Sequence, residues 1–370
     1  MREQSLNFLR TLVNTPSPVG HEVRGQRVWL DYAAEFADET FSDAYGNCVA
    51  VLNKGGSPRL MIAGHADEIA MSVNYINDDG FIYVRKMGGV NAAITKAQRV
   101  IIHSSRGNRA AVKGVVGNVA PHLMKEEKDQ KMPQMHDLFI DIGVNSRRAA
   151  EELVRIGDPI TLADEFDLLR NDLAVARAFD NRIGTFAVAE TLRLLKGSKS
   201  RLHAEVCAVS NVQEEVGLLG ARQIAYSLKP DIALVVDVTH ATDYPTVNKL
   251  QHGDVKIGRG PTITHGSRKH WDFRRSKPLL HSRDAGFFLC AFDVVTTARN
   301  GLGTENGFRL RHQLGDARRK RRRGVLRHQE RFGVCVGCKN RQRQMGAQSG
   351  CRCREHGCAL EPHSSRDNRF

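Results

Sequence analysis

The chain has 370 residues, of which 41% are hydrophobic and 26% are charged. This length and composition can build a sizeable core, so they exclude a wholly disordered polymer and a small disulfide-bonded scaffold. The formal net charge of +14 is unevenly spread, because residues 301–370 hold 17 basic against 6 acidic side chains. The basic balance therefore describes the last part of the chain rather than the whole.

Cysteine usage divides the chain in the same way. Cys48, Cys207 and Cys290 are scattered over the first 300 residues, and the other five of the eight cysteines crowd the end. Scattered, unpaired cysteines are typical of a reducing compartment. The first residues show helical spacing instead of a signal peptide, and no run of about eighteen apolar residues occurs. We therefore expect a cytoplasmic protein that does not span a membrane.

The first 162 residues predict a helix, two strands and then a β-rich segment. Apolar residues at helical spacing stop at the proline-rich turn 15–20, and short β-rich runs follow at 49–52 and 60–63. From about residue 70 to 162 the strand-like pieces are short and separated by Gly, Asn and Asp. This texture predicts a small β domain, inserted at 71–162.

Helices and strands alternate again after the insert. Residues 183–195 carry one apolar helical face, and Asp180 is placed like the N-cap of that helix. A strand at 205–210, a helix at 218–228 and a strand at 232–236 follow. This order predicts a crossover unit in a buried, largely parallel sheet, and hence an α/β fold. We expect one catalytic domain made of residues 1–70 and 163–273.

The patterning fails beyond about residue 273. The segment 274–370 is rich in Arg, Gly and Cys and has scarcely any apolar periodicity, so we expect an irregular tail. We hypothesise that the chain is out of frame from about residue 270. The alternative is a genuine zinc module at Cys335, Cys338, Cys351 and Cys353, next to a basic run at 318–323 that can contact phosphates.

Acidic and histidine side chains cluster where the predicted strands end. His65 and Asp67 follow the strand at 60–63, Glu214 and Glu215 follow the next, and Asp237 follows the last. Because ligands bind at the carboxyl ends of strands in open α/β sheets, these groups can converge. One imidazole with several carboxylates suits zinc, cobalt or manganese, and the lack of thiolates favours a catalytic site.

Each of these residues also has a simpler interpretation. A single histidine after a strand is more often a surface or hydrogen-bonded residue, and an adjacent glutamate pair is usually solvated. Asp180 can merely cap its helix, and Asp237 can merely end a strand. Side chains two apart on an extended chain share a face, however, so Asp67 can orient the ring of His65. Four such coincidences at one sheet edge favour a single site.

Several segments resemble the tetrahedral aminopeptidase family, which comprises glutamyl and deblocking aminopeptidases with two metals per subunit, some of them formerly labelled cellulases. The resemblance covers about the first 265 residues. The matching stretches are TPSPVGHE (15–22), AGHADEIAMSV (63–73), KGVVGNVAPHL (113–123), LFIDIGVNS (138–146), GDPIT (157–161), ARAFDNRIG (176–184), NVQEEVGLLGA (211–221) and DVTHATDYP (237–245).

The resemblance implies a three-layer, mixed-sheet metallopeptidase domain with an inserted small β-barrel, and cytoplasmic homo-oligomers. It implies two divalent cations per subunit, zinc or cobalt, held by four residues with Asp180 as the bridge. It also makes Asp67 the orienting carboxylate and Glu214 the general base of a metal-assisted hydrolysis that releases N-terminal residues from short peptides. The four metal ligands are His65, Asp180, Glu215 and Asp237.

The chain also departs from the family. Ala66, Ala70 and Asn181 replace common Met, Gly and Asp residues without removing a ligand. The terminal His-x-Pro-x-Glu strand, which carries the remaining metal ligand in the family, is not found. His281 and His312 are the tail histidines that could replace it, and we expect weak or absent activity.

Two other functions stay open at this point. An endoglucanase-type glycoside hydrolase is suggested by the old cellulase label, but it assigns no role to His65 or Asp237. A nucleic-acid-binding protein acting through its basic tail would bind DNA in a salt-sensitive way.

Overall fold

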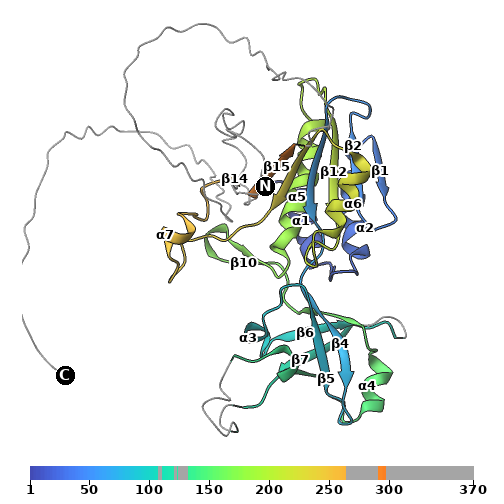
Figure 1. Cartoon of the computed structure of the whole chain (residues 1–370), viewed down its shortest axis with the longest axis vertical. Helices are drawn as coiled ribbons and strands as arrows, with labels where there is room; N and C mark the ends of the chain where they lie inside the picture. The colour runs from blue at the N-terminus through green and yellow to red at the C-terminus, as the bar shows by residue number, and fades with distance from the viewer. Residues whose placement is uncertain (107–110, 121–122, 124–131, 264–290, 297–370) are drawn as a thin grey trace, which may run out of the picture. The chain divides into compact units, whose positions relative to one another are not determined.

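The structure is a computed structural model that describes residues 1–106, 111–120, 123, 132–263 and 291–296 (Figure 1). All of these residues lie in one compact unit, Met1–Lys339. The proposed zinc module, the basic run, Cys290, His281 and His312 lie outside the described residues.

Within the described part of the chain, seven strands form one mixed sheet in the order β1-β2-β12-β3-β13-β15-β14 (Figure 1). The three strands β12, β3 and β13 lie side by side and run parallel, as the predicted crossover requires. Their carboxyl ends therefore meet at one edge. The bounds are β1 Glu39–Ser42, β2 Cys48–Leu52, β3 Arg59–His65, β12 Glu205–Asn211, β13 Ile232–Asp237, β14 Thr262–Ile263 and β15 Ala291–Thr296.

The strand β15 falls inside the segment for which the sequence predicts an irregular tail. It pairs antiparallel with the whole of β13, from Ile232 opposite Thr296 to Asp237 opposite Ala291. The local sequence pattern could not predict the pairing of β15 with β13, because it joins segments about 60 positions apart along the chain.

Helices cover both faces of the sheet, which gives the expected three layers. In β2 the side chains of Cys48, Ala50 and Leu52 belong to one apolar cluster, whereas Val49 and Val51 belong to another. The alternation follows from the two-residue period of a strand. The helices α1 (Glu3–Asn14), α2 (Val23–Ala34) and α5 (Phe179–Lys196) pack on the first face, and α6 (Leu219–Leu228) packs on the second.

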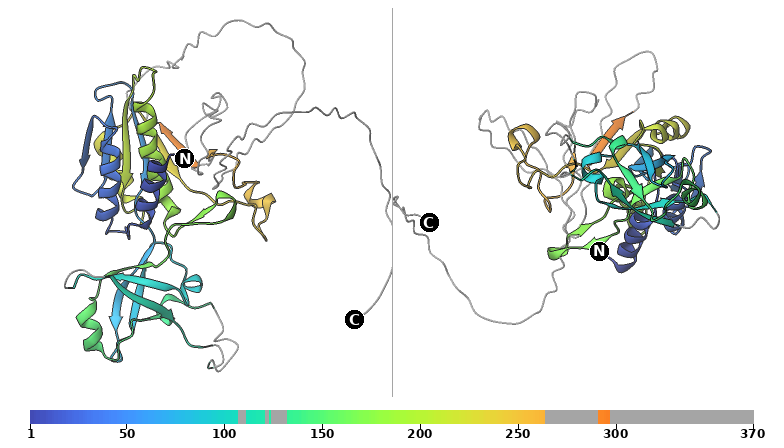
Figure 2. Two further views of the ribbon diagram at one scale, coloured as in Figure 1. Left: turned by 180° about the vertical axis from the view of Figure 1, so that it is seen from behind. Right: turned by 90° about the horizontal axis from the view of Figure 1, so that it is seen from below.

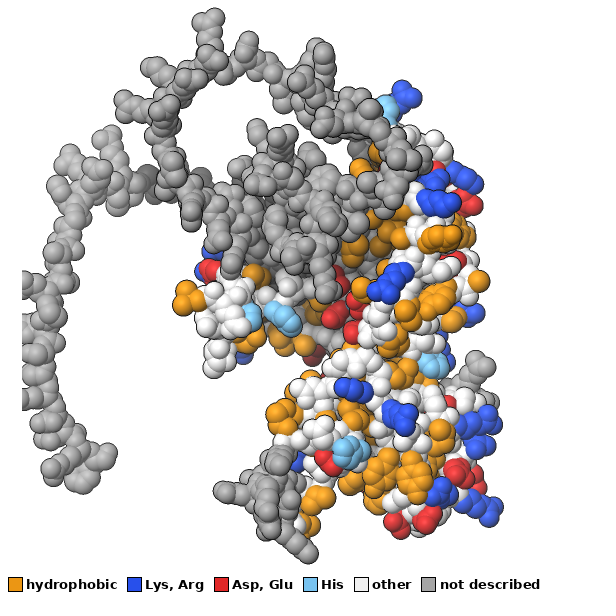
Figure 3. Space-filling view, in the orientation of Figure 1, with side chains coloured by type: hydrophobic (Ala, Val, Ile, Leu, Met, Phe, Trp, Pro, Cys, Tyr) orange, Lys and Arg blue, Asp and Glu red, His pale blue; other side chains and the backbone are white. Residues whose placement is uncertain are grey.

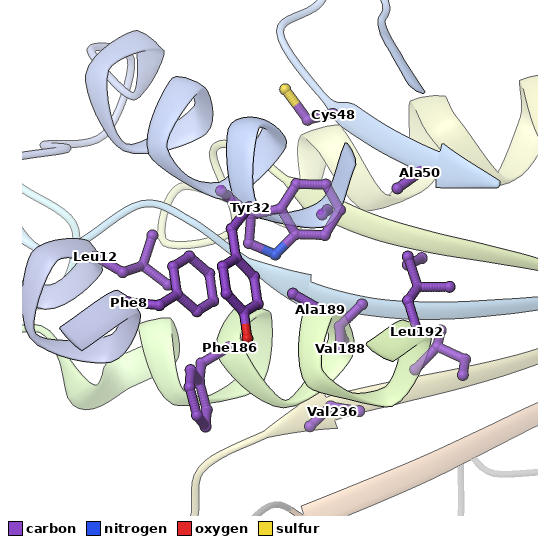
Figure 4. Close-up of a cluster of buried hydrophobic side chains, with 14 of the residues drawn as sticks. Phe8, Leu12, Tyr32, Cys48, Ala50, Phe186, Val188, Ala189, Leu192 and Val236 are labelled. Atoms are coloured by element: carbon purple, nitrogen blue, oxygen red, sulfur yellow. The ribbon is translucent and has the colours of Figure 1, made fainter. Parts of the chain in front are cut away.

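The larger cluster joins the helices to the sheet through aromatic and branched side chains (Figure 4). Phe8 of α1 stacks on Tyr32 of α2 with 3.8 Å between ring centroids. Trp29 is fully buried, and its Nε1 donates a hydrogen bond to the carbonyl of Thr185 in α5 at 2.8 Å. This packing fixes the start of α5, which carries Asp180, against the sheet.

The β-rich segment forms a closed barrel in the strand order β4-β5-β8-β7-β6-β9. The barrel strands, coloured from light blue to green, form a group apart from the seven-stranded sheet in Figure 1 and in the left view of Figure 2. Val73, Val100, Ile102 and Ile140 are among the buried side chains that fill it. The strand bounds are β4 Ala70–Ile76, β5 Ile82–Met87, β6 Arg99–His103, β7 Ala111–Gly117, β8 Phe139–Asp141 and β9 Pro159–Leu162.

Short elements complete the described part of the chain. They are α3 (Ala92–Thr95), η3 (Met135–Asp137), α4 (Arg147–Leu153), β10 (Asp167–Leu168), η4 (Arg170–Asp172), β11 (Ala174–Val175) and α7 (Lys249–His252). No helix among the described residues is long and apolar enough to cross a bilayer. The cytoplasmic location and the domain limits stay predictions.

The expectation that Asp180 caps its helix is wrong. Asp180 has an extended backbone, with φ of −80° and ψ of 111°, and the peptide bond to Asn181 is cis. The capping contact comes instead from Asn181, whose Oδ1 accepts a hydrogen bond from the N–H of Gly184 at 2.9 Å. The side chain of Asp180 is thereby left to face the end of β3.

Candidate active site

The structure brings together five side chains that the sequence places in one site. His65 and Asp237 are the last residues of β3 and β13, and Glu214 and Glu215 follow the end of β12. Nε2 of His65 lies 3.1 Å from Oδ1 of Asp180, 3.8 Å from Oε2 of Glu214 and 3.9 Å from Oδ1 of Asp237.

These side chains form two overlapping groups that share the imidazole. His65 with Glu214 and Glu215, and His65 with Asp180 and Asp237, each offer ligand atoms within 4.8 Å of one another. His65 is 3% exposed, whereas the side chain of Asp180 is 58% exposed. The site is therefore closed at the sheet and open to solvent at Asp180. Acidic side chains also gather as red spheres on the face drawn in Figure 3.

Among the residues that the structure describes, His65 is the only cationic side chain that pairs with the carboxylates of this site. In the described part of the chain, neither Lys nor Arg forms an ion pair with Asp180, Glu214, Glu215 or Asp237. Burial, together with the charge of Asp180, raises the pKa of Glu215 to about 7 and that of Asp237 to about 6. Burial raises the pKa of Glu214 as well. Groups that resist ionisation in this way gain most from a bound cation.

The imidazole is oriented for such a cation. Nδ1 of His65 lies 3.1 Å from the carbonyl oxygen of Asp67 and 3.4 Å from its carboxylate. Since both atoms are acceptors, Nδ1 carries a hydrogen. Burial opposes the charged ring, but Asp180 and Asp67 outweigh it and raise the pKa of His65 well above its ordinary value. A bound cation would take the place of the proton on Nε2. The donor set of one imidazole and four carboxylates fits zinc or cobalt.

Asp67 also fixes the loop that carries the two glutamates. Its fully buried carboxylate accepts hydrogen bonds from the N–H groups of Glu214 and Glu215, both at 3.0 Å. Burial by itself would raise the pKa of Asp67, but His65 and the two amides outweigh it and lower the pKa. Asp67 therefore stays ionised and joins the end of β3 to the loop after β12.

Glu22, the last residue of the stretch TPSPVGHE, supports the same loop, a role that the sequence does not indicate. Its buried carboxylate accepts hydrogen bonds from the N–H groups of Gly20 at 2.8 Å and Gln213 at 3.2 Å. With Asp67, it holds three successive amides of the loop. Burial is the main reason that the pKa of Glu22 is raised.

A buried ion-pair network under the site was missed by the sequence reasoning. The carboxylate of Glu68 lies 2.9 Å from Arg177 and 3.2 Å from Arg182, and it accepts a hydrogen bond from the N–H of Ser17. Arg182 is fully buried and donates a hydrogen bond to the carbonyl of Ala66 at 2.6 Å. The available signal was an arginine at the start of an apolar helix, two residues after the candidate ligand Asp180.

Comparisons with known proteins match this fold and site. A family described as M42 glutamyl aminopeptidase matches residues 46–274. The lysyl aminopeptidase of Pyrococcus furiosus is 33% identical over 262 residues, which cover 70% of this chain and 72% of the relative. The crystal structure of a TET aminopeptidase from a marine sediment archaeon, Thaumarchaeota archaeon, has a TM-score of 0.67 and 31% identity, and covers 70% of this chain and 72% of that chain.

A second solved structure bears on assembly. It is the TET1 peptidase of Pyrococcus horikoshii, described as able to assemble into a tetrahedron or a large octahedral shell. It has a TM-score of 0.59 and 30% identity, and covers 70% of this chain and 74% of that chain.

Proposed function

Because the chain belongs to the M42 glutamyl aminopeptidase family, we propose that it is a metal-dependent aminopeptidase that removes the N-terminal residue of short peptides. The observation that carries the proposal is the convergence of His65, Asp180, Glu214, Glu215 and Asp237 at one sheet edge. No Lys or Arg in the described ranges forms an ion pair with them. A peptide bond is very stable, and such a site can supply the charge that its hydrolysis requires.

Two divalent cations, zinc or cobalt, belong to the proposal. His65, Asp180, Glu215 and Asp237 would hold them, with Asp180 between the two. When bound, the cations would lower the pKa of a water molecule and polarise the scissile carbonyl. Asp67 holds the imidazole of His65 in the orientation that leaves Nε2 free.

Glu214 is the general base in this proposal. It accepts a proton from the attacking water as the new C–O bond forms, and it returns that proton to the amine nitrogen as the C–N bond breaks. Its pKa is raised mainly by burial, which strengthens it as a base. A free amino group at the start of the substrate would be held by the nearby carboxylates.

The other functions gain no support from the site. A glycoside hydrolase needs a pair of carboxylates around a sugar bond and still leaves His65 and Asp237 without a task. Nucleic-acid binding depends on the basic tail, which lies outside the described residues.

Assembly into a homo-oligomer is also part of the proposal, since the TET1 peptidase of Pyrococcus horikoshii is described as a shell-forming protein. Light scattering of the purified chain tests this directly. A monomer at the concentrations used for activity measurements would contradict it.

A shift of reading frame near residue 270 is consistent with the end of the family match at residue 274. We therefore expect weak activity in this chain and stronger activity once the frame is restored. Resequencing of the coding region tests the shift. An intact gene whose tail is verified by mass spectrometry would contradict it.

The central experiment measures the metal content of the chain beside that of an Asp180→Ala variant. We expect bound zinc or cobalt in the parent and a clear loss in the variant. Hydrolysis of aminoacyl p-nitroanilides should stop when a chelator is added. Hydrolysis that is indifferent to the chelator, or equal metal content in both proteins, would overturn the proposed function.

A further inference from the structure

The loop that leaves strand β5 of the barrel lies against the candidate site. The strand ends at Met87, and the pair Gly88 and Gly89 follows before α3. Gly88 has a φ of +78°, a backbone conformation that glycine adopts freely and other residues adopt rarely. The barrel thus brings main-chain atoms, rather than a side chain, to this position.

Gly88 can approach the site closely because it has no β-carbon. A β-carbon built there would lie 2.9 Å from Cγ2 of Ile69, 3.1 Å from Cβ of Glu215 and 3.4 Å from Oε2 of Glu215. Carbon atoms pack at about 3.5 to 4.0 Å, so the first two separations are too short for an undisturbed contact. Any side chain at this position would have to displace Glu215 or Ile69.

This contact matters because the carboxylate of Glu215 has few other restraints. Its backbone N–H is fixed by Asp67 at 3.0 Å. Across the ranges that the structure describes, however, no hydrogen bond or ion pair reaches the Glu215 carboxylate itself. The direction of the side chain therefore depends on packing, and Gly88 lies directly beside its β-carbon and Oε2.

We propose that Gly88 is a positioning residue that keeps the Glu215 carboxylate beside His65 and Glu214, so that the inserted barrel helps to build the cation site. The inference rests on the proposed function, because it takes Glu215 to be a cation ligand. It goes further by giving the barrel a part in the site. A β-carbon at residue 88 would weaken the group of His65, Glu214 and Glu215 and leave that of His65, Asp180 and Asp237 intact.

The chain supplies a closely matched control. Gly143 lies in the same barrel segment with a φ of +79°, and a β-carbon built there meets nothing within 4 Å. Gly88→Ala and Gly143→Ala therefore place alanine at nearly the same φ and differ in what the new methyl group touches. A Glu215→Gln variant identifies the binding event that depends on Glu215.

The experiment titrates cobalt(II) into the full-length chain after chelator treatment, with calorimetry and the cobalt absorption spectrum as the two readouts. In Gly88→Ala we expect the Kd of the Glu215-dependent event to rise by about tenfold or more, the scale found when residues that orient metal ligands are changed. The cobalt spectrum should change as well. Gly143→Ala should match the parent in both measurements.

Each outcome separates this inference from the function on which it rests. Equal Kd values for Gly88→Ala and Gly143→Ala would overturn the role of Gly88 and leave the metallopeptidase proposal standing. A parent chain that binds no cobalt, or a Glu215→Gln variant that binds it unchanged, would overturn both.

A second variant keeps the inference testable if Gly88→Ala folds poorly. Ile69 is 41% exposed, so Ile69→Ala can be tolerated, and it removes the methyl group nearest to the new β-carbon. The double variant Ile69→Ala with Gly88→Ala should still lose affinity relative to Ile69→Ala alone, because the contact with Glu215 remains. Equal affinity of these two proteins would overturn the inference.

Discussion

Two layers of carboxylates lie at the carboxyl ends of the parallel strands, and they differ in the partners that compensate their charge. In the inner layer, Asp67 and Glu68 are buried and are matched by backbone amides, by His65 and by two arginines. In the outer layer, Glu215 and Asp237 face other carboxylates, and their pKa values are raised to about 7 and about 6.

The inner carboxylates stabilise the fold, whereas the outer carboxylates are explained by the ligand that they bind. A buried carboxylate is tolerated when hydrogen bonds and opposite charges satisfy it, and removal of one partner then destabilises the fold. The outer carboxylates destabilise the cation-free protein instead, so their presence is explained by what they bind. Three substitutions and a pH series test this difference.

The largest effect is expected where an inner partner is removed. Arg182→Met leaves the buried Glu68 with less compensation, and we expect the free energy of unfolding to fall by about 3 to 5 kcal/mol. Urea unfolding measures this change. The control is Arg148→Met, which removes an exposed ion pair with Glu152 and should cost less than about 1 kcal/mol. Similar losses of unfolding free energy in both variants would contradict the structural role of the buried ion pairs of Glu68.

Removal of an outer carboxylate should have the opposite effect on stability. In Asp237→Asn, the affinity for cobalt should fall by about a hundredfold, the upper end of the range for altered metal surroundings. The cation-free variant should be at least as stable as the parent, because one of several repelling charges is gone. If the cation-free variant is less stable than the cation-free parent, Asp237 stabilises the fold in the way that Asp67 and Glu68 do.

The pH dependence follows from the same carboxylates. Glu215 and Asp237 have folded pKa values of about 7 and about 6, above their ordinary values of 4.5 and 3.8. Between the ordinary and the folded values, Glu215 and Asp237 bind more protons in the folded chain than in the unfolded chain. The contribution of these two groups to the stability of the cation-free protein should therefore decrease as the pH rises from about 4 to about 7. Cation affinity should increase over the upper part of this range, because the ligands must be deprotonated. Thermal unfolding with and without cobalt measures both trends.

The smallest expected effect concerns the support of the glutamate loop. Glu22→Ala removes the acceptor for the amides of Gly20 and Gln213, and we expect a loss of about 1 to 3 kcal/mol. Hydrogen exchange at Gln213 should become faster, whereas exchange at Glu214, which is held by Asp67, should change less. Equal acceleration at both amides would show that the loop depends on Glu22 as a whole.

The sequence predicted the elements that depend on local pattern and missed those that depend on distant partners. The strand expected at 60–63 is confirmed, although it continues to His65, and the crossover through α6 is confirmed as well. Spacing along the chain could not predict how β4 pairs with β9 to close the barrel, because the two strands are separated by more than 80 residues.

The candidate site was predictable in its residue types and much less so in its support. An imidazole and carboxylates after three strands indicated the site, since strand ends meet at a sheet edge. The sequence favours Asp180 as the cap because aspartate and asparagine are both favoured caps, and only the hydrogen bond from the N–H of Gly184 identifies Asn181. Glu68 and Arg182 were passed over because a charged residue is normally expected at the surface.

Both junctions between the barrel and the sheet adjoin a candidate ligand. On the outward path β3 ends at His65 and β4 begins at Ala70, and on the return path the chain passes β11 and reaches Asp180 at the start of α5. An exchange of inserted barrels between relatives would have to preserve these two junctions. The outer turns, such as residues 77–81 between β4 and β5, contain no candidate ligand, so substitutions there would act on the barrel and not on the donor set.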